Sequence, residues 1–242
     1  LKKNLNPKYF IVDHKLRKES TYEAYKVKKI LKSLKINSQV LTWKGKKPVS
    51  NIQSLARSKR YELLFLKCKK LKISNLVLGH HIDDVIENFF LRMARGSGLK
   101  GLVSLGTNTQ IENINLIRPL IEFDKRDLIF LSKFIFNFYV DDPTNDDIKF
   151  NRIKVRNLIK RFEDFGLDKK KFQLTIENLK KSDQSIKFYV EKNKRENSIF
   201  NYRNDELILK KNFFDNSHEV IFRSLSDLIH LVGKKPNFVR GK

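Results

Sequence analysis

The sequence is poor in cysteine, glycine and proline. Cys68 is the single cysteine among 242 residues, which excludes an internal disulfide framework and any metal or iron–sulfur site built from several cysteines. We therefore expect a protein of a reducing compartment, the cytoplasm. Nine glycines and five prolines are too few for a collagen-like chain. There is no apolar run long enough to cross a bilayer and no signal peptide, so we expect no membrane partner.

Acidic residues are also scarce, with 27 Asp and Glu against 51 Lys and Arg, a net charge of +24. Hydrophobic residues make up 40% of the chain, enough for a globular protein of one or two domains. The charge favours a polyanionic partner, and nucleic acid over membrane because no basic amphipathic anchor stands out. A chain rich in Lys, Asn, Ile and Phe is equally typical of an AT-rich genome, so the total alone does not decide between function and codon bias.

The distribution of charge is more informative than the total. The net charge is +17 over residues 1–80, −3 over residues 81–150 and +10 over residues 151–242. An acidic segment between two basic ones is typical of a chemical site flanked by surfaces that bind a polyanion.

Strand and helix patterns alternate through the first part of the chain. We expect strands at 9–12, 38–43 and 75–78, each followed by a helix, at 19–35, 50–71 and 82–93. This order predicts right-handed βαβ units and one parallel sheet, an α/β fold. In such a sheet ligands bind beyond the carboxyl ends of the strands, where His14, His80 and His81 stand.

The pattern changes in the last third of the chain. Before the change we expect a strand at 115–117, helices at 124–137 and 150–162, and a turn at 141–145. Beyond it we expect a long helix from about residue 168, a strand at 207–209 and a helix at 217–231. We therefore predict a first domain over residues 1–165 and a smaller, basic, mainly helical α+β domain over residues 166–242.

The helix at 82–93 is the most informative element. One stripe is apolar and is expected to pack on the sheet; it consists of Ile82, Val85, Ile86, Phe89, Phe90 and Met93. Asp84 and Glu87 stand opposite this stripe, three residues apart. Two carboxylates near a helix N-terminus can bind an ammonium group, orient an amine or help to hold a metal.

His80 and His81 stand at the start of the same helix. Their spacing to the carboxylates resembles some metal sites, but without a further His or Asp cluster we predict no metal-ligating residue. For Asp83 we expect only a favourable interaction with the helix dipole.

A glycine-containing segment at 95–102 could offer backbone N–H groups to a phosphate. It follows a helix, so it does not fit a dinucleotide-binding turn.

Seven ordered blocks then resemble a known family. They are VDHKLR with Ser20, NIQ with Ala56-Arg57 and Arg60-Tyr61, GHHIDDVIEN at 79–88, RGSG with Gly101-Leu102, RPL at 118–120, DPTN at 142–145 and RIKVR at 152–156. Together they resemble bacterial tRNA(Ile)-lysidine synthases of the N-type ATP pyrophosphatase (PP-loop) superfamily, whose fold is adenine nucleotide alpha hydrolase-like.

The resemblance implies an ATP-dependent ligase. Such an enzyme adenylates O2 of the wobble cytidine of an isoleucine tRNA with a CAU anticodon, then joins free L-lysine to C2. The implied cofactor is ATP with Mg²⁺, and a homodimer is compatible with the resemblance.

The resemblance also assigns roles to residues. The catalytic set is Asp84, Glu87 and His81, with the two carboxylates binding and orienting lysine. The ATP-binding set is His14, Arg57, Gly79 and His80. The tRNA-binding set is Arg95, Arg118, Arg152, Lys154 and Arg156.

The sequence departs from the family in places. The family's Ser-Gly-Gly-x-Asp-Ser phosphate loop does not occur in it, and Val85 and Asn88 replace the usual Gln and Thr. We therefore expect the first strand and the phosphate loop of the domain to be missing, the basic domain to be cut short, and the 242-residue segment alone to have little ATP-dependent activity. Two alternatives stay open: a relative of the PP-loop tRNA thiolases, and a basic tRNA-binding module without catalysis.

Overall fold

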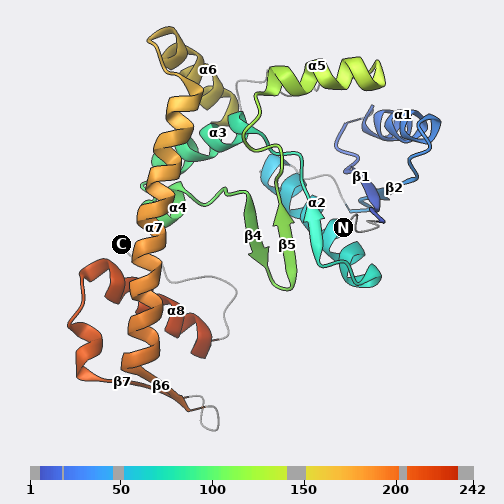
Figure 1. Ribbon diagram of the computed structural model, residues 1–242. Coiled ribbons are helices and arrows are strands. Elements are labelled where there is room, and N and C mark those ends of the chain that lie inside the picture. Colours follow the sequence, from blue (N-terminus) through green and yellow to red (C-terminus); the bar gives the residue numbers. More distant parts are fainter. Residues whose placement is uncertain (1–5, 18, 46–51, 141–150, 202–205, 234–242) are drawn as a thin grey trace, which may run out of the picture. The chain divides into compact units, whose positions relative to one another are not determined.

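Two compact units make up the chain in a computed structural model (Figure 1). The structure describes residues 6–17, 19–45, 52–140, 151–201 and 206–233, with the backbone alone at 52–54 and 151–152. The first unit contains Leu1–Glu87 and Leu105–Asn157, and the second contains Asn88–Ser104 and Leu158–Lys242. These are units of packing, and the functional boundary between residues 165 and 166 stays a prediction.

The first unit confirms the expected alternation of strands and helices. Its elements are β1 (Tyr9–Asp13), α1 (Ser20–Ser33), β2 (Ser38–Thr42), α2 (Ile52–Leu71), β3 (Asn75–Val77), the start of α3 (Ile82–Met93), β4 (Asn108–Ile111), β5 (Ile114–Ile117), α5 (Lys125–Phe136) and the start of α6 (Asn151–Asp164). The predicted turn at 141–145 and the start of the helix predicted from residue 50 lie outside the described residues.

The prediction of one continuous parallel sheet is wrong. β1 pairs in parallel with β2, and β3 pairs in parallel with β5, but these pairs belong to separate sheets. Among the described strands nothing pairs with the second edge of β1 or of β3. A cavity of about 1250 Å³ is lined by residues of both strands.

A hairpin also escaped prediction. β4 runs antiparallel to β5 and pairs Ile111 with Ile114 across a two-residue turn. Glu112 takes a positive φ of 52° in that turn. A turn without glycine at this position gives only a weak sequence signal, because non-glycine residues seldom adopt that conformation.

α2 joins the two sheets through a shared apolar core. Its Leu64 and Cys68 pack with Leu76 of β3 and with Ile114 and Leu116 of β5. Partly buried side chains of β1 and β2 pack against the same cluster. β1 and β3 are therefore supported by the same apolar cluster.

The apolar stripe of α3 is only partly as predicted. Ile82, Val85 and Ile86 are buried, but Met93 is 51% exposed. The Phe90 ring stacks on Phe162 and Phe172, with centroids 5.6 and 5.5 Å apart, rather than on a sheet. The end of the stripe thus packs against aromatic side chains of other helices.

The second unit is mainly helical, as expected. It contains α4 (Leu99–Leu102), α7 (Lys169–Asn197), β6 (Ser198–Asn201), β7 (Glu206–Leu209), a 3-10 turn (Lys211–Phe214) and α8 (His218–Gly233). β6 pairs antiparallel with β7. The sequence analysis predicted β7 but not β6. Arg223 of α8 is buried and donates to Asp183 of α7 at 2.6 Å, which fastens the two helices together.

None of the described helices is long and apolar enough to pass through a bilayer.

Leucine-to-alanine substitutions provide a matched test of this core. Leu116 is 1% exposed whereas Leu66 is 60% exposed. We expect Leu116→Ala to lower the free energy of unfolding by about 3–4 kcal/mol, because it leaves a cavity in the core. Leu66→Ala should change it by about 0.5 kcal/mol or less. Urea denaturation followed by circular dichroism measures both, and equal losses would contradict this core.

Candidate active site

The turn after β1 is built around a buried carboxylate. Asp13 is 1% exposed and accepts hydrogen bonds from Lys15 N at 3.0 Å, Ser20 Oγ at 2.9 Å and Thr21 Oγ1 at 2.7 Å. Burial opposes ionisation, but the hydrogen bonds outweigh it and lower the pKa of Asp13. The carboxylate therefore fixes the passage from β1 into α1, and with it the position of His14.

His14 meets a basic side chain of α2. Its Nε2 lies 3.2 Å from Arg60 Nη2. His14, Arg60 and Gly79 all line the cavity described above. The structure thus brings two residues of the predicted ATP-binding set together and adds Arg60, which the set omitted. The signal for Arg60 was its position one helical turn after Arg57.

Arg57 lies over the ring of Tyr61, with its Cζ 5.1 Å from the ring centroid. Its Nη2 donates to the Tyr61 hydroxyl at 3.2 Å. The aromatic ring holds the Arg57 guanidinium near His80. The positive charge of that guanidinium helps to lower the pKa of His80.

His80, after β3, is linked to the end of β5. Arg118 Nε donates to His80 Nδ1 at 3.2 Å. Burial, together with Arg57, Arg118 and Arg60, lowers the pKa of His80 to about 4, against the opposing charge of Asp84. His80 is therefore a neutral imidazole at pH 7.

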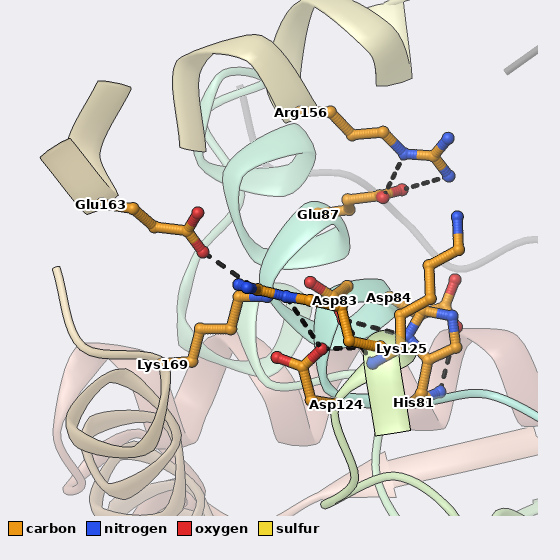
Figure 2. Close-up of polar contacts among 10 residues, drawn as sticks. His81, Asp83, Asp84, Glu87, Asp124, Lys125, Arg156, Glu163 and Lys169 are labelled. Atoms are coloured by element: carbon orange, nitrogen blue, oxygen red, sulfur yellow. Dashed lines mark hydrogen bonds and ion pairs between the residues drawn. The ribbon is translucent and has the colours of Figure 1, made fainter. Parts of the chain in front are cut away.

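His81 behaves in the opposite way. Its Nδ1 lies 3.4 Å from Asp83 Oδ2, and its Nε2 lies 3.4 Å from Asp84 Oδ2 (Figure 2). Burial acts to lower the pKa of His81, but the two carboxylates outweigh burial and raise that pKa. The pKa values of the two adjacent imidazoles therefore shift in opposite directions, because arginines surround His80 whereas carboxylates contact His81.

The first turn of α3 uses both aspartates. Asp84 Oδ2 accepts from the backbone N–H of His81 at 3.0 Å, which closes the helix start. Asp83 Oδ2 accepts from the backbone N–H of Lys125 at 3.2 Å. The expectation that Asp83 only complements the helix dipole was too narrow, since it also ties α3 to the start of α5.

The place of Glu87 opposite the apolar stripe suggested an exposed side chain, but the structure buries it. It is 5% exposed and forms an ion pair with Arg156 of α6, which approaches it through Nε and Nη2 (Figure 2). Burial acts to lower the pKa of Arg156, but the hydrogen bond and charge of Glu87 outweigh burial and raise that pKa. The partner lies 69 positions away in the sequence, beyond the reach of helix periodicity.

The predicted tRNA-binding residues fall into different environments. Arg95 and Lys154 are exposed, whereas Arg118 is 3% exposed and Arg156 is paired with Glu87. The side chain of Arg152 and the block at 142–145 lie outside the described residues.

The segment at 95–102 is not an open phosphate loop. Gly96 takes a φ of 69° at the end of α3, and Ser97 N donates to Arg92 O at 3.0 Å, a helix-ending motif. The four-residue helix α4 follows. The glycines here end one helix and begin another.

No group of three or more His, Cys, Asp or Glu side chains that could hold a metal ion occurs in the part of the chain that the structure describes.

Comparison with known proteins identifies the family. A family model described as a PP-loop domain matches residues 1–162. The chain belongs to the PP-loop domain family. The match starts at residue 1, so it does not support the expectation that the first strand and phosphate loop of the domain are missing.

Relatives of this PP-loop chain include curated tRNA(Ile)-lysidine synthases. The one from Orientia tsutsugamushi is 41% identical over 152 residues, which cover 62% of this chain and 34% of the relative. The one from a Wolbachia of Brugia malayi is 34% identical and covers 74% of this chain and 42% of the relative. The one from Ruegeria pomeroyi is 27% identical and covers 92% and 52%. The chain thus spans about a third to a half of the length of these relatives.

The fold also resembles a solved structure. A U34-tRNA thiolase from Methanococcus maripaludis, solved with its [4Fe-4S] cluster, superposes with a TM-score of 0.58 at 16% identity. The match covers 71% of this chain and 59% of the thiolase. At this identity the likeness concerns the fold.

The Glu87–Arg156 pair predicts a stability effect. Glu87→Gln leaves a half-buried guanidinium without its charge partner and should lower the free energy of unfolding by about 2–4 kcal/mol. The double variant Glu87→Gln/Arg156→Met should recover at least about half of that loss, because no unpaired charge remains.

An exposed pair is the matched control. Glu112 and Lys69 form an ion pair in which both side chains are about 60% exposed, and Glu112→Gln should cost less than about 1 kcal/mol. Chemical denaturation at pH 7 measures all variants. Equal costs for Glu87→Gln and Glu112→Gln would contradict the buried pair.

Proposed function

We propose that the chain is the catalytic PP-loop part of a tRNA(Ile)-lysidine synthase. In this proposal ATP activates C2 of the wobble cytidine of an isoleucine tRNA, and the side-chain amine of free L-lysine replaces the activated oxygen. The observation that carries the proposal is the acidic first turn of α3 beside two imidazoles at the carboxyl end of β3, in a chain whose relatives bear that name.

Two bond changes make up the reaction. Cytidine O2 attacks the α-phosphorus of ATP, an O–P bond forms, and pyrophosphate leaves. The lysine amine then attacks C2, a C–N bond forms, and the C–O bond breaks to release AMP. The second step needs a neutral amine held against C2, which is a matter of positioning.

The acidic turn suits the binding of an amine substrate. Asp84 is a quarter exposed, and its second carboxylate oxygen can face a ligand while Oδ2 accepts from the His81 backbone. His81, drawn toward positive charge by Asp83 and Asp84, acts in this proposal as a positioning residue. Glu87 acts through its pair with Arg156, which holds the second turn of α3 in place.

The other side of the site suits a triphosphate. Arg57 and Arg60 of α2 supply positive charge beside His14 and His80, and Gly79 has open space where a side chain would stand. Because glycine has no side chain, a ligand can come close to the backbone at this position. Mg²⁺ would enter with the triphosphate as part of the substrate.

The thiolase alternative is not favoured. An iron–sulfur cluster needs several cysteine ligands, and persulfide chemistry needs an accessible, reactive cysteine. Cys68 is the single cysteine of the sequence, is fully buried in the core, and has a pKa raised by burial. It packs as a small apolar residue.

The binding-module alternative differs from an enzyme in one measurable property. A module without catalysis would bind tRNA but would neither release pyrophosphate from ATP nor incorporate lysine. The protein that carries this sequence should do both in the presence of the isoleucine tRNA transcript, as measured with radiolabelled ATP and lysine.

Asp84 provides a test of the amine site. Asp84→Asn should reduce lysine incorporation by about 100-fold, because the amine loses its charged anchor, and should leave tRNA affinity within about threefold. Asp127→Asn, an exposed aspartate in the first turn of α5, is the matched control and should behave as the parent. Unchanged lysine incorporation in Asp84→Asn would refute this role.

The exposed basic residues provide a test of tRNA contact. Lys154→Gln and Arg95→Gln should each reduce the slope of log affinity against log salt by roughly 0.7–0.9, because each removes one phosphate contact. Filter binding between 50 and 300 mM KCl measures the slope. A slope that stays unaltered in both variants would count against phosphate contact at these positions.

A further inference from the structure

The contact between Arg118 and His80 fixes more than a distance. An arginine side chain carries donors and no acceptor. Because Arg118 Nε donates to His80 Nδ1 at 3.2 Å, Nδ1 must present its lone pair. The proton of the neutral imidazole then stands on Nε2.

Arg118 is itself held from several sides. Its side chain donates through Nη1 to Gly106 O at 2.8 Å and to Thr109 Oγ1 at 2.9 Å. Its backbone N–H donates to Thr107 O at 2.8 Å. With 3% of its surface exposed, the guanidinium has little freedom to turn away from the imidazole.

The surroundings of His80 favour the same state. Arg57 and Arg60 approach from α2, Arg118 from the end of β5, and Asp84 from α3. Three cations against one carboxylate, together with burial, disfavour an imidazolium. A cationic His80 would also place a proton on Nδ1, against the Nε–H of Arg118.

We propose that Arg118 is a positioning residue that fixes His80 as the neutral Nε2–H tautomer, so that His80 offers one directed hydrogen-bond donor to an anionic oxygen at the carboxyl end of β3. The nature of that oxygen, a phosphate of the nucleotide, rests on the proposed function, whereas the tautomer does not. His80 then donates without transferring its proton, and Arg118 serves the site from within the fold rather than contacting RNA.

The tautomer is directly observable by NMR. Long-range ¹H–¹⁵N correlation spectra separate the two tautomers of neutral histidine, and the His80 signal is the one of five that His80→Gln removes. We expect the Nε2–H pattern, unchanged between pH 8 and pH 5.5. A mixed pattern, or titration of His80 near its ordinary value of 6.5, would overturn the proposal.

Removal of Arg118 tests the cause. In Arg118→Gln the His80 pattern should become mixed and its titration midpoint should rise by about one pH unit, because a cation and a fixed donor are lost. Arg126→Gln removes an exposed arginine of the same unit and should leave the His80 signal unchanged. An Arg118→Gln spectrum identical to that of the parent would overturn the proposal. Should this variant fail to fold, the spectrum of the parent protein still decides the tautomer.

Two isosteres test the donor. A glutamine amide places its N–H near the position of Nε2, and an asparagine amide places it near Nδ1. His80→Gln should bind ATP within about threefold of the parent, and His80→Asn should bind about tenfold more weakly or worse. Equal ATP affinity in both variants would overturn the donor role. Failure of the parent to bind ATP would instead refute the proposed function, and with it the phosphate partner, while leaving the tautomer assignment to the NMR result.

Discussion

The buried ion pair between Glu87 and Arg156 is the constraint on which the acidic end of the site depends. A carboxylate that is 5% exposed must keep a cation beside it, since an unpaired buried charge costs several kcal/mol. Arg156 meets that need from another helix, so the start of α6 and the middle of α3 are fixed to each other. One turn earlier on α3, Asp84 is left with a backbone donor and an imidazole as its partners, and it remains partly open to a ligand.

The two adjacent histidines extend the same logic. His80 faces arginines and stays neutral, whereas His81 faces aspartates and is drawn toward the charged form. The peptide between them therefore joins a mainly positive environment to a mainly negative one. Two ligands of opposite charge, such as a triphosphate and an ammonium group, can bind side by side only where the protein offers positive charge to one and negative charge to the other. The difference in charge also keeps each ligand out of the other's position.

Much of the first unit could be predicted from the sequence because its signals are local. Apolar runs predicted the strands, 3.6-residue spacing predicted the helices, and the polar residues after β1 and β3 indicated the strand ends where the candidate site lies. The environment of Glu87 could not be predicted, because its place on the helix wheel suggested solvent while its partner stands 69 residues away. The split of the parallel sheet was missed for a similar reason, since strand spacing along the chain does not report which edges meet.

The arginines show how far a motif can be interpreted without geometry. Arg95, Arg118 and Arg156 stand in blocks that suggested one shared role in holding tRNA. Yet Arg118 donates hydrogen bonds to an imidazole, a carbonyl and a hydroxyl. Arg156 donates through two nitrogens to Glu87, whereas Arg95 is exposed. Part of the net charge of +24 therefore lies on buried or paired arginines, which set the environment of His80 and Glu87. The charge that meets a polyanion has to be sought among exposed side chains such as Lys154, because counterion release requires a cation that phosphate can reach.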